Sequence, residues 1–148
     1  MLKLIVRKYL EGLFFTKNPT EKKILEPSDK LIAQKEISFN LHNQRVDDVA
    51  IPKADIVAAP DKITLSELTK IFRESNLTRL PIFKSTLDNP IGFVHLKDLA
   101  LRNGFGKQKK FNITDLIRPL IYVPPSMTLG TLLQKMQAER IHMSLVID

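Results

Sequence analysis

An internal repeat constrains the fold of this chain more than any other feature of its sequence. Residues 54–84 align without a gap on residues 118–148, and apolar residues occupy matching positions in the two copies. Three positions near the start of each candidate helix are identical, namely Thr64/Thr128, Leu65/Leu129 and Leu68/Leu132. Self-similarity at a fixed shift is typical of proteins built from copies of one supersecondary unit. The chain is therefore predicted to contain two related α/β units.

The first copy is predicted to form a strand, a helix and two further strands. Residues 55–59 are a short apolar run, and Thr64 with Glu67 forms the pattern of a capping box at the start of a helix that reaches Ser75. Residues 79–83 and 91–96 read as strands on either side of a turn at 88–90, and residues 97–102 begin a second helix.

The second copy repeats only the beginning of this pattern. Residues 120–123 read as a strand, residues 128–140 as a helix and residues 142–147 as a strand, with no later counterpart of residues 91–102. A βαβ unit that ends on its second strand leaves part of its sheet unpaired. We therefore expect a truncated second repeat, arising either from a fragment or from a sheet that another chain completes.

The first 44 residues read as a separate helical arm. Apolar residues recur at helical spacing over residues 2–13, with basic residues between them, and Asn18-Pro19 interrupts the pattern. Such a helix can pack on the body of the protein or on a second subunit, or it can dock on a membrane surface or a partner. The expected organisation is thus an arm over 1–44, one repeat over 45–111 and an incomplete repeat over 112–148.

Composition narrows the classes of function. The 148 residues contain no cysteine, which excludes disulfides, cysteine-based zinc or iron–sulfur sites and a cysteine nucleophile. The net charge of +7 favours contact with a nucleotide, a nucleic acid or a membrane surface. The basic segment 107–110 suits nucleic acid, but the aromatic content of 7% and the lack of tryptophan favour a solvated loop. No apolar run is long enough to span a bilayer, and no secretory signal is readable.

Longer strings in the repeat region resemble a known family. The β-α-β-β-α pattern resembles a CBS domain pair, also called a Bateman module. The strings RVDDVAIPKADIV, TRLPIF, PIGFVHLKDL and RIHMSLVID, which begin at residues 45, 78, 90 and 140, are similar to the hemolysin C and CorC-type magnesium and cobalt efflux family. The resemblance covers residues 44–148. It implies an α/β (α+β) fold of tandem CBS repeats with pseudo-two-fold symmetry.

The resemblance also implies an adenosine nucleotide, AMP or ATP, in a cleft between the repeats, with magnesium arriving as Mg-ATP and no metal site of its own. It places Asp98 as the carboxylate that accepts hydrogen bonds from the ribose hydroxyls. The further residues that it suggests are His95 and Arg79 at the phosphate, Ile56, Val57 and Pro81 as walls of the adenine slot, and Tyr122 and Met143 at the other cleft. Each has an ordinary alternative role in a helix start, a solvated strand edge or the core. One adenylate per chain is expected.

Catalysis is not expected. The sequence has no phosphate-binding Walker loop and no dinucleotide glycine fingerprint. Its three histidines do not share a metal-ligand spacing, and no Ser-His-Asp constellation is readable.

Two functions remain open. The first is a regulatory nucleotide-sensing module of an ion-efflux protein, in the cytoplasm or at the inner face of the plasma membrane. Family members place a transporter-associated domain after the CBS pair, and many carry a membrane domain before it. The second is a structural dimerisation module without nucleotide. A homodimer is expected in both cases, and the helix faces at Leu68, Phe72, Leu132 and Met136 are either its surface or intramolecular core.

Overall fold

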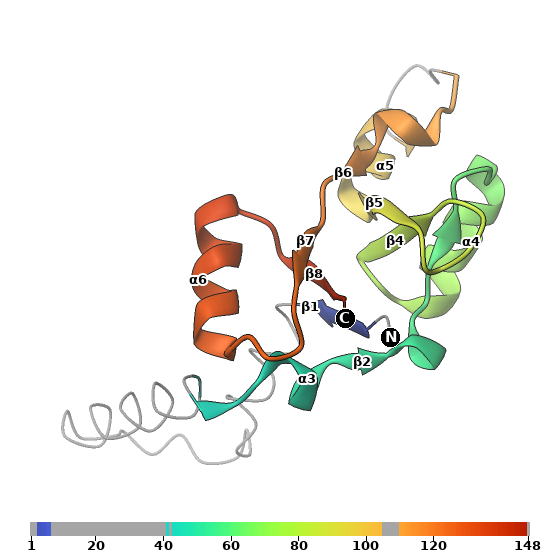
Figure 1. The fold of residues 1–148 in the computed structure, drawn as a ribbon. Coiled ribbons are helices and arrows are strands. Elements are labelled where there is room, and N and C mark those ends of the chain that lie inside the picture. Colours follow the sequence, from blue (N-terminus) through green and yellow to red (C-terminus); the bar gives the residue numbers. More distant parts are fainter. Residues whose placement is uncertain (1–2, 7–40, 42, 105–109, 148) are drawn as a thin grey trace, which may run out of the picture. The chain divides into compact units, whose positions relative to one another are not determined.

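The computed structural model describes residues 3–6, 41, 43–104 and 110–147 (Figure 1). These residues form two compact units. One contains the described residues of 1–54 together with 121–147, and the other contains residues 55–120. Residues 7–13 of the expected arm helix and residues 107–109 of the basic segment lie outside the described part of the chain.

The unit over 55–120 is a four-stranded sheet with helices packed on one face. Its strands are β3 (Ala59–Pro60), β4 (Arg79–Phe83), β5 (Pro90–His95) and β6 (Ile117–Arg118), in the order β3-β4-β5-β6. β3 runs parallel to β4, whereas β5 is antiparallel to both of its neighbours. The helix α4 (Leu65–Ser75) connects β3 to β4, as a parallel crossover requires. After β5 come α5 (Leu96–Leu99), a π-helical turn at Ala100–Gly104 and a 3-10 turn at Ile113–Asp115.

The core of this unit follows from strand alternation and helix periodicity. Leu80 and Ile82 of β4 and Val94 of β5 face the same side of the sheet, where they pack with Leu68 and Phe72 of α4. The intervening residues of β4 and β5 therefore belong to the opposite face. That alternation decides which side chains of these strands are available to a ligand.

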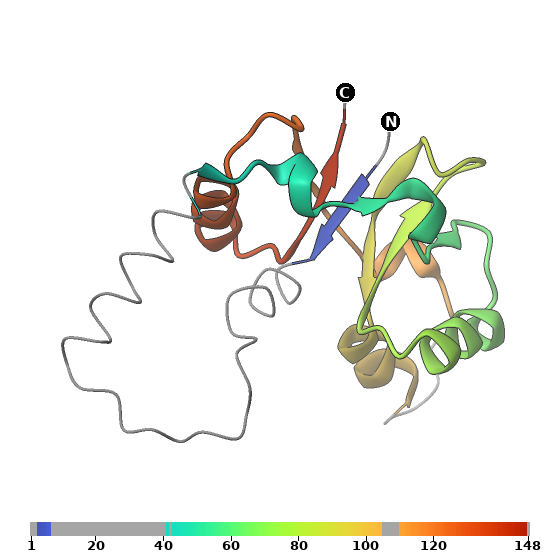
Figure 2. The ribbon, with the colours of Figure 1, turned by 90° about the horizontal axis from the view of Figure 1, so that it is seen from below.

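The other unit repeats this arrangement with strands taken from both ends of the described chain. Its strands are β1 (Lys3–Val6), β2 (Ile51–Pro52), β7 (Ile121–Val123) and β8 (Met143–Val146), in the order β2-β1-β8-β7. β7 is parallel to β8, and β1 is antiparallel to both β8 and β2. The helix α6 (Leu129–Glu139) connects β7 to β8, and α3 (Val46–Val49) precedes β2 (Figure 2).

The internal repeat is visible in the helix ends of the two units. Thr64 and Thr128 cap α4 and α6 by accepting from the amide three residues later. Glu67 completes the predicted capping box by accepting from the Thr64 amide at 2.9 Å. Each helix then ends on a left-handed residue, Asn76 with φ 55° and Arg140 with φ 54°. The two copies thus share their strand pairing and both helix boundaries.

The structure corrects the prediction for the beginning of the chain. Residues 3–6 form a strand rather than the first turn of a helix, because pairing with the edge of β8 gives their backbone groups ladder partners. A short amphipathic segment gains little as an isolated helix in water. The sheet edge that was expected to lack a partner is therefore paired within the described chain.

The first predicted strand is also shorter than expected. Only Ala59 and Pro60 pair with β4, and Lys53–Asp55 form a 3-10 turn. In β4, Pro81 directly precedes Ile82, which is the partner of Ala59. Proline has no amide hydrogen, so it cannot donate a hydrogen bond that would extend the pairing of the two strands.

The sequence left two roles open for the apolar faces of α4 and α6, a dimer surface or the intramolecular core. The structure shows that both faces belong to the core. The side chains of Leu68, Phe72, Leu132 and Met136 are at most 4% exposed, and each packs within its own unit. Among the helices of the described residues, none is long and apolar enough to cross a membrane.

Candidate functional site

The candidate site forms where β5 passes into α5. His95 is the last residue of β5 and the N-cap of α5, and its Nδ1 accepts a hydrogen bond from the Lys97 backbone amide at 3.0 Å. This bond satisfies an amide that the helix itself leaves without a partner. Leu99 is buried in the core and anchors the helix. Asp98 lies in the same first turn, and its side chain remains 22% exposed.

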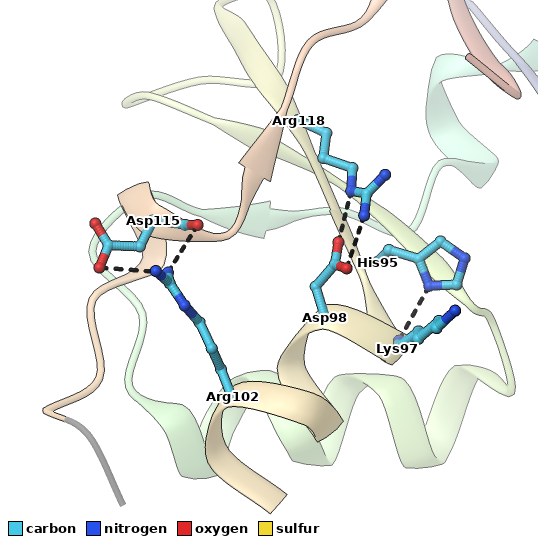
Figure 3. Close-up of polar contacts among 6 residues, drawn as sticks. All are labelled: His95, Lys97, Asp98, Arg102, Asp115 and Arg118. Carbon is cyan, nitrogen blue, oxygen red and sulfur yellow. Dashed lines mark hydrogen bonds and ion pairs between the residues drawn. The ribbon is translucent and has the colours of Figure 1, made fainter. Parts of the chain in front are cut away.

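Asp98 forms a two-point ion pair with Arg118 of β6 (Figure 3). Arg118 Nε donates to Asp98 Oδ2 at 2.6 Å, and Arg118 Nη2 donates to Asp98 Oδ1 at 2.7 Å. Parallel charge-assisted bonds of this kind are stronger and more directional than single ones. β6 brings Arg118 to this place because it pairs with β5, with Arg118 opposite Phe93.

Three more groups, Arg79, His95 and Lys97, interact electrostatically with this pair. Arg79 is the cross-strand partner of His95, and Lys97 lies in the first turn beside Asp98. Burial and then the charge of Arg79 lower the pKa of His95, while Asp98 acts in the opposite direction. His95 is therefore neutral at pH 7 and accepts at Nδ1. The hydrogen bonds from Arg118 hold the pKa of Asp98 below its ordinary value, so it is ionised.

A cleft of about 290 Å³ lies beside the ion pair. Its lining comes from α5, the π-helical turn, the 3-10 turn and β6, and consists of Asp98, Leu101, Arg102, Asp115, Leu116, Ile117 and Arg118. The lining includes a second ion pair: Arg102 Nη1 donates to the Asp115 carbonyl oxygen at 2.8 Å and lies 3.3 Å from Oδ2 (Figure 3). This volume lies just below the ~300–1,000 Å³ typical of small-molecule sites.

The structure brings three of the predicted site residues together. Asp98, His95 and Arg79 interact electrostatically, and Pro81 lies in the same strand as Arg79, two residues further along. Strand alternation places Arg79 and Pro81 on the sheet face opposite to the helices.

The other predicted residues lie before β3 or belong to the other unit. Ile56 is buried and Val57 is 40% exposed, and both precede β3, the edge strand opposite to β6 in the sheet. Tyr122 and Met143 belong to the other unit. Tyr122 is 41% exposed, whereas Met143 is fully buried in that unit.

Sequence reasoning missed Arg118, the ion-pair partner of Asp98. It lies in a two-residue strand without β-branched alternation, and Pro119 follows it. Its partner is 20 positions away, so only the β5–β6 pairing reveals the contact. The internal repeat gives no clue, because the position that matches Arg118 in the sheet of the other unit is Ile51.

The two carboxylates that line the cleft, Asp98 and Asp115, are each paired with an arginine. Within residues 3–6, 41, 43–104 and 110–147, no three His, Cys, Asp or Glu side chains are grouped so as to hold a metal ion. The chemistry of the cluster is instead that of one carboxylate among cations, which suits a ligand that carries both hydroxyl and anionic groups.

Comparison with known proteins places the chain in a family. The CBS domain family matches residues 46–102 and 113–148. A hemolysin C homolog of Rickettsia rickettsii (strain Sheila Smith) is 37% identical over 111 residues, which are 74% of this chain and 36% of that protein. The chain therefore spans about a third of the length of this curated relative.

Solved structures share the fold. The CBS domain of a bacterial CNNM/CorC family Mg²⁺ transporter in complex with ATP gives a TM-score of 0.70 at 24% identity, over 82% of this chain and 84% of that one. A CBS-domain pair with bound AMP from Klebsiella pneumoniae gives 0.52 at 19% identity, over 65% and 76% of the two chains. The chain belongs to the CBS domain family, and the curated relatives that it matches include hemolysin C homologues.

Proposed function

We propose that this chain is a regulatory module that binds an adenosine nucleotide, AMP or ATP, and passes the signal to other domains of a magnesium and cobalt efflux protein. The observation that carries the proposal is an ionised carboxylate, Asp98, at a helix start beside a cleft and among cationic side chains. A carboxylate accepts from vicinal ribose hydroxyls, and cations attract phosphate.

Specific residues are assigned to the two polar ends of the nucleotide. Asp98 accepts from the 2′- and 3′-hydroxyls of the ribose. Arg79 and Lys97 provide positive charge for the phosphate, and neutral His95 offers a ring N–H at Nε2, because Nδ1 is occupied by the Lys97 amide. Pro81 remains the proposed wall for the adenine. Magnesium is proposed to arrive with ATP.

Two structural relatives support the choice of ligand. One is a CBS domain in complex with ATP, the other is a CBS-domain pair with bound AMP, and both have the fold of this chain. Regulation requires that the nucleotide bind two arrangements of the protein with different affinity, because a ligand with equal affinity for both shifts nothing. The transporter-associated domain, the membrane domain and a homodimer are proposed partners in that coupling.

Isothermal titration with AMP, ADP and ATP, each with and without magnesium, tests the proposal. We expect one adenylate per chain. Asp98→Ala should weaken binding about 10- to 100-fold, since a hydrogen bond to a charged group contributes about 1.5–3 kcal/mol. Glu74→Ala is the matched control, because Glu74 is an exposed carboxylate at the far end of α4, ion-paired only to Lys70 at 3.8 Å among the described residues.

The possible results separate the alternatives. Saturable binding that Asp98→Ala weakens and Glu74→Ala leaves unchanged supports the nucleotide sensor. Absence of heat with every adenylate favours the dimerisation module. Two equal sites per chain, or unchanged affinity in Asp98→Ala, would contradict the site assignment.

A further inference from the structure

The two-point ion pair occupies the edge of Asp98 that a ribose would need. Arg118 reaches both carboxylate oxygens, at 2.6 Å and 2.7 Å, with two parallel N–H donors. A pair of vicinal hydroxyls presents the same geometry, with two neighbouring donors directed at two oxygens. A guanidinium and a ribose therefore compete for one edge of this carboxylate.

We infer that Arg118 is an internal competitor of the ribose. Its guanidinium occupies the carboxylate of Asp98 in the free protein and leaves it when a nucleotide binds. The inference rests on the proposed function and concerns the regulation of that site. It assigns to Arg118 a competing role that the sequence does not reveal.

The exposure of the pair makes release feasible. The side chain of Arg118 is 55% exposed, and that of Asp98 is 22% exposed. Water can solvate the guanidinium as soon as it leaves the carboxylate, so no charge is left buried without a partner. An ion pair at this exposure shifts an equilibrium by about two- to fivefold, which a ligand can overcome.

Release also changes the charge that the cluster presents. While paired, Arg118 and Asp98 neutralise each other, and Arg79 and Lys97 remain as the cations beside them. Once a ribose takes the carboxylate, the charge of Arg118 is available to a phosphate. The phosphate of a nucleotide can therefore pair with the freed Arg118, which offsets the free energy lost when the Asp98–Arg118 pair opens. A nucleoside has no phosphate, so it has no such compensation.

Comparison of adenosine with AMP isolates this effect. Arg118→Met removes the competitor and its charge, so we expect adenosine to bind about two- to fivefold more tightly than to the wild type. AMP should gain less than adenosine or lose affinity, because the variant also lacks the cation. The ratio of AMP to adenosine affinity should therefore fall. Both ligands are measured by isothermal titration on the full chain.

Two further variants control the experiment. Arg73→Met removes an exposed cation of α4 that is not among the residues lining the cleft, and it should leave the ratio of AMP to adenosine affinity unchanged. Arg118→Lys keeps the charge but cannot form the two-point contact, so it should tighten adenosine while retaining AMP. Thermal unfolding of each variant confirms that it is folded.

The outcomes distinguish this inference from the function on which it rests. Wild-type binding with unchanged or weaker adenosine affinity in a folded Arg118→Met overturns the competitor and leaves the proposed function intact. Absence of binding in both the wild type and Arg118→Met overturns both. Binding of adenosine by Arg118→Met alone supports the inference in its strongest form.

Discussion

Replacement of Gly92 by alanine should destabilise the unit over 55–120, because β5 and β6 approach closely at this residue. A Cβ on Gly92 would lie 2.5 Å from the Arg118 carbonyl oxygen and nearer still to Cγ2 of Ile117. The φ of 157° is also one that L-residues rarely adopt. Either β6 moves away or the ladder between the two strands breaks.

The loss of stability in Gly92→Ala depends on which atoms would have to move to make room for the new Cβ. The obstacle includes backbone atoms of β6, so a change of rotamer cannot relieve the clash. Overpacking of this kind costs about 1–3 kcal/mol. For a unit of this size, the midpoint of thermal unfolding should fall by about 4–24 °C.

Thermal unfolding followed by circular dichroism measures the change, with Gly104→Ala as the matched control. Among the described residues, a Cβ on Gly104 meets only the Ala100 Cβ, at 3.9 Å, so that variant should unfold at the wild-type temperature or slightly above. Because β6 carries Arg118, Gly92→Ala should also change adenylate affinity. A Gly92→Ala protein with the wild-type midpoint would refute the close approach of the two strands.

Three further predictions concern burial and charge. Ser144→Ala should raise the unfolding midpoint, because the Ser144 hydroxyl is buried without a hydrogen-bond partner among the described residues, and such a group costs about 1–3 kcal/mol. Leu4→Ala should lower the free energy of unfolding, measured in urea, by about 2–4 kcal/mol, because Leu4 is 5% exposed on β1 and a cavity would remain; an unchanged value would contradict the β1–β8 pairing. Arg118 lowers the pKa of Asp98 from 3.8, so the carboxylate stabilises the folded state above that pH, and this contribution is lost as the pH falls through the lowered pKa. The stability difference between wild type and Asp98→Asn should therefore be largest near neutral pH and shrink as the pH falls below 3.8, and a constant difference would argue against the ion pair.

The parts of the fold that depend on local chemistry could be predicted from the sequence. The capping pattern and apolar spacing of residues 64–75 define α4, and the predicted strand over Arg79–Phe83 has the bounds of β4. The repeat in the sequence corresponds to the repeat in the strand pairing. These features lie within one element or recur in two copies, so neighbouring residues contain the necessary information.

The parts that depend on distant partners could not be predicted. β1 has helical spacing when it is read alone, and only the edge of β8 makes it a strand. Asp98 could be proposed from the family resemblance, but its partner Arg118 is set by the β5–β6 register. The candidate site thus combines a carboxylate that the sequence reveals with a cation that only the tertiary structure places.

The pairing of β1 with β8 has a consequence for the order in which the protein folds. The strands and helices of the unit over 55–120 come from one continuous stretch, whereas β1 pairs Val6 with Met143 at the other end of the described chain. Closing so long a loop is entropically unfavourable, and contacts between distant residues slow folding. We expect the amides of Leu80 and Val94 to become protected from hydrogen exchange before that of Leu145. The edge of β8 would then stay open while the unit that carries Asp98 is already formed, so the Asp98–Arg118 ion pair would be in place before the other unit has closed its sheet.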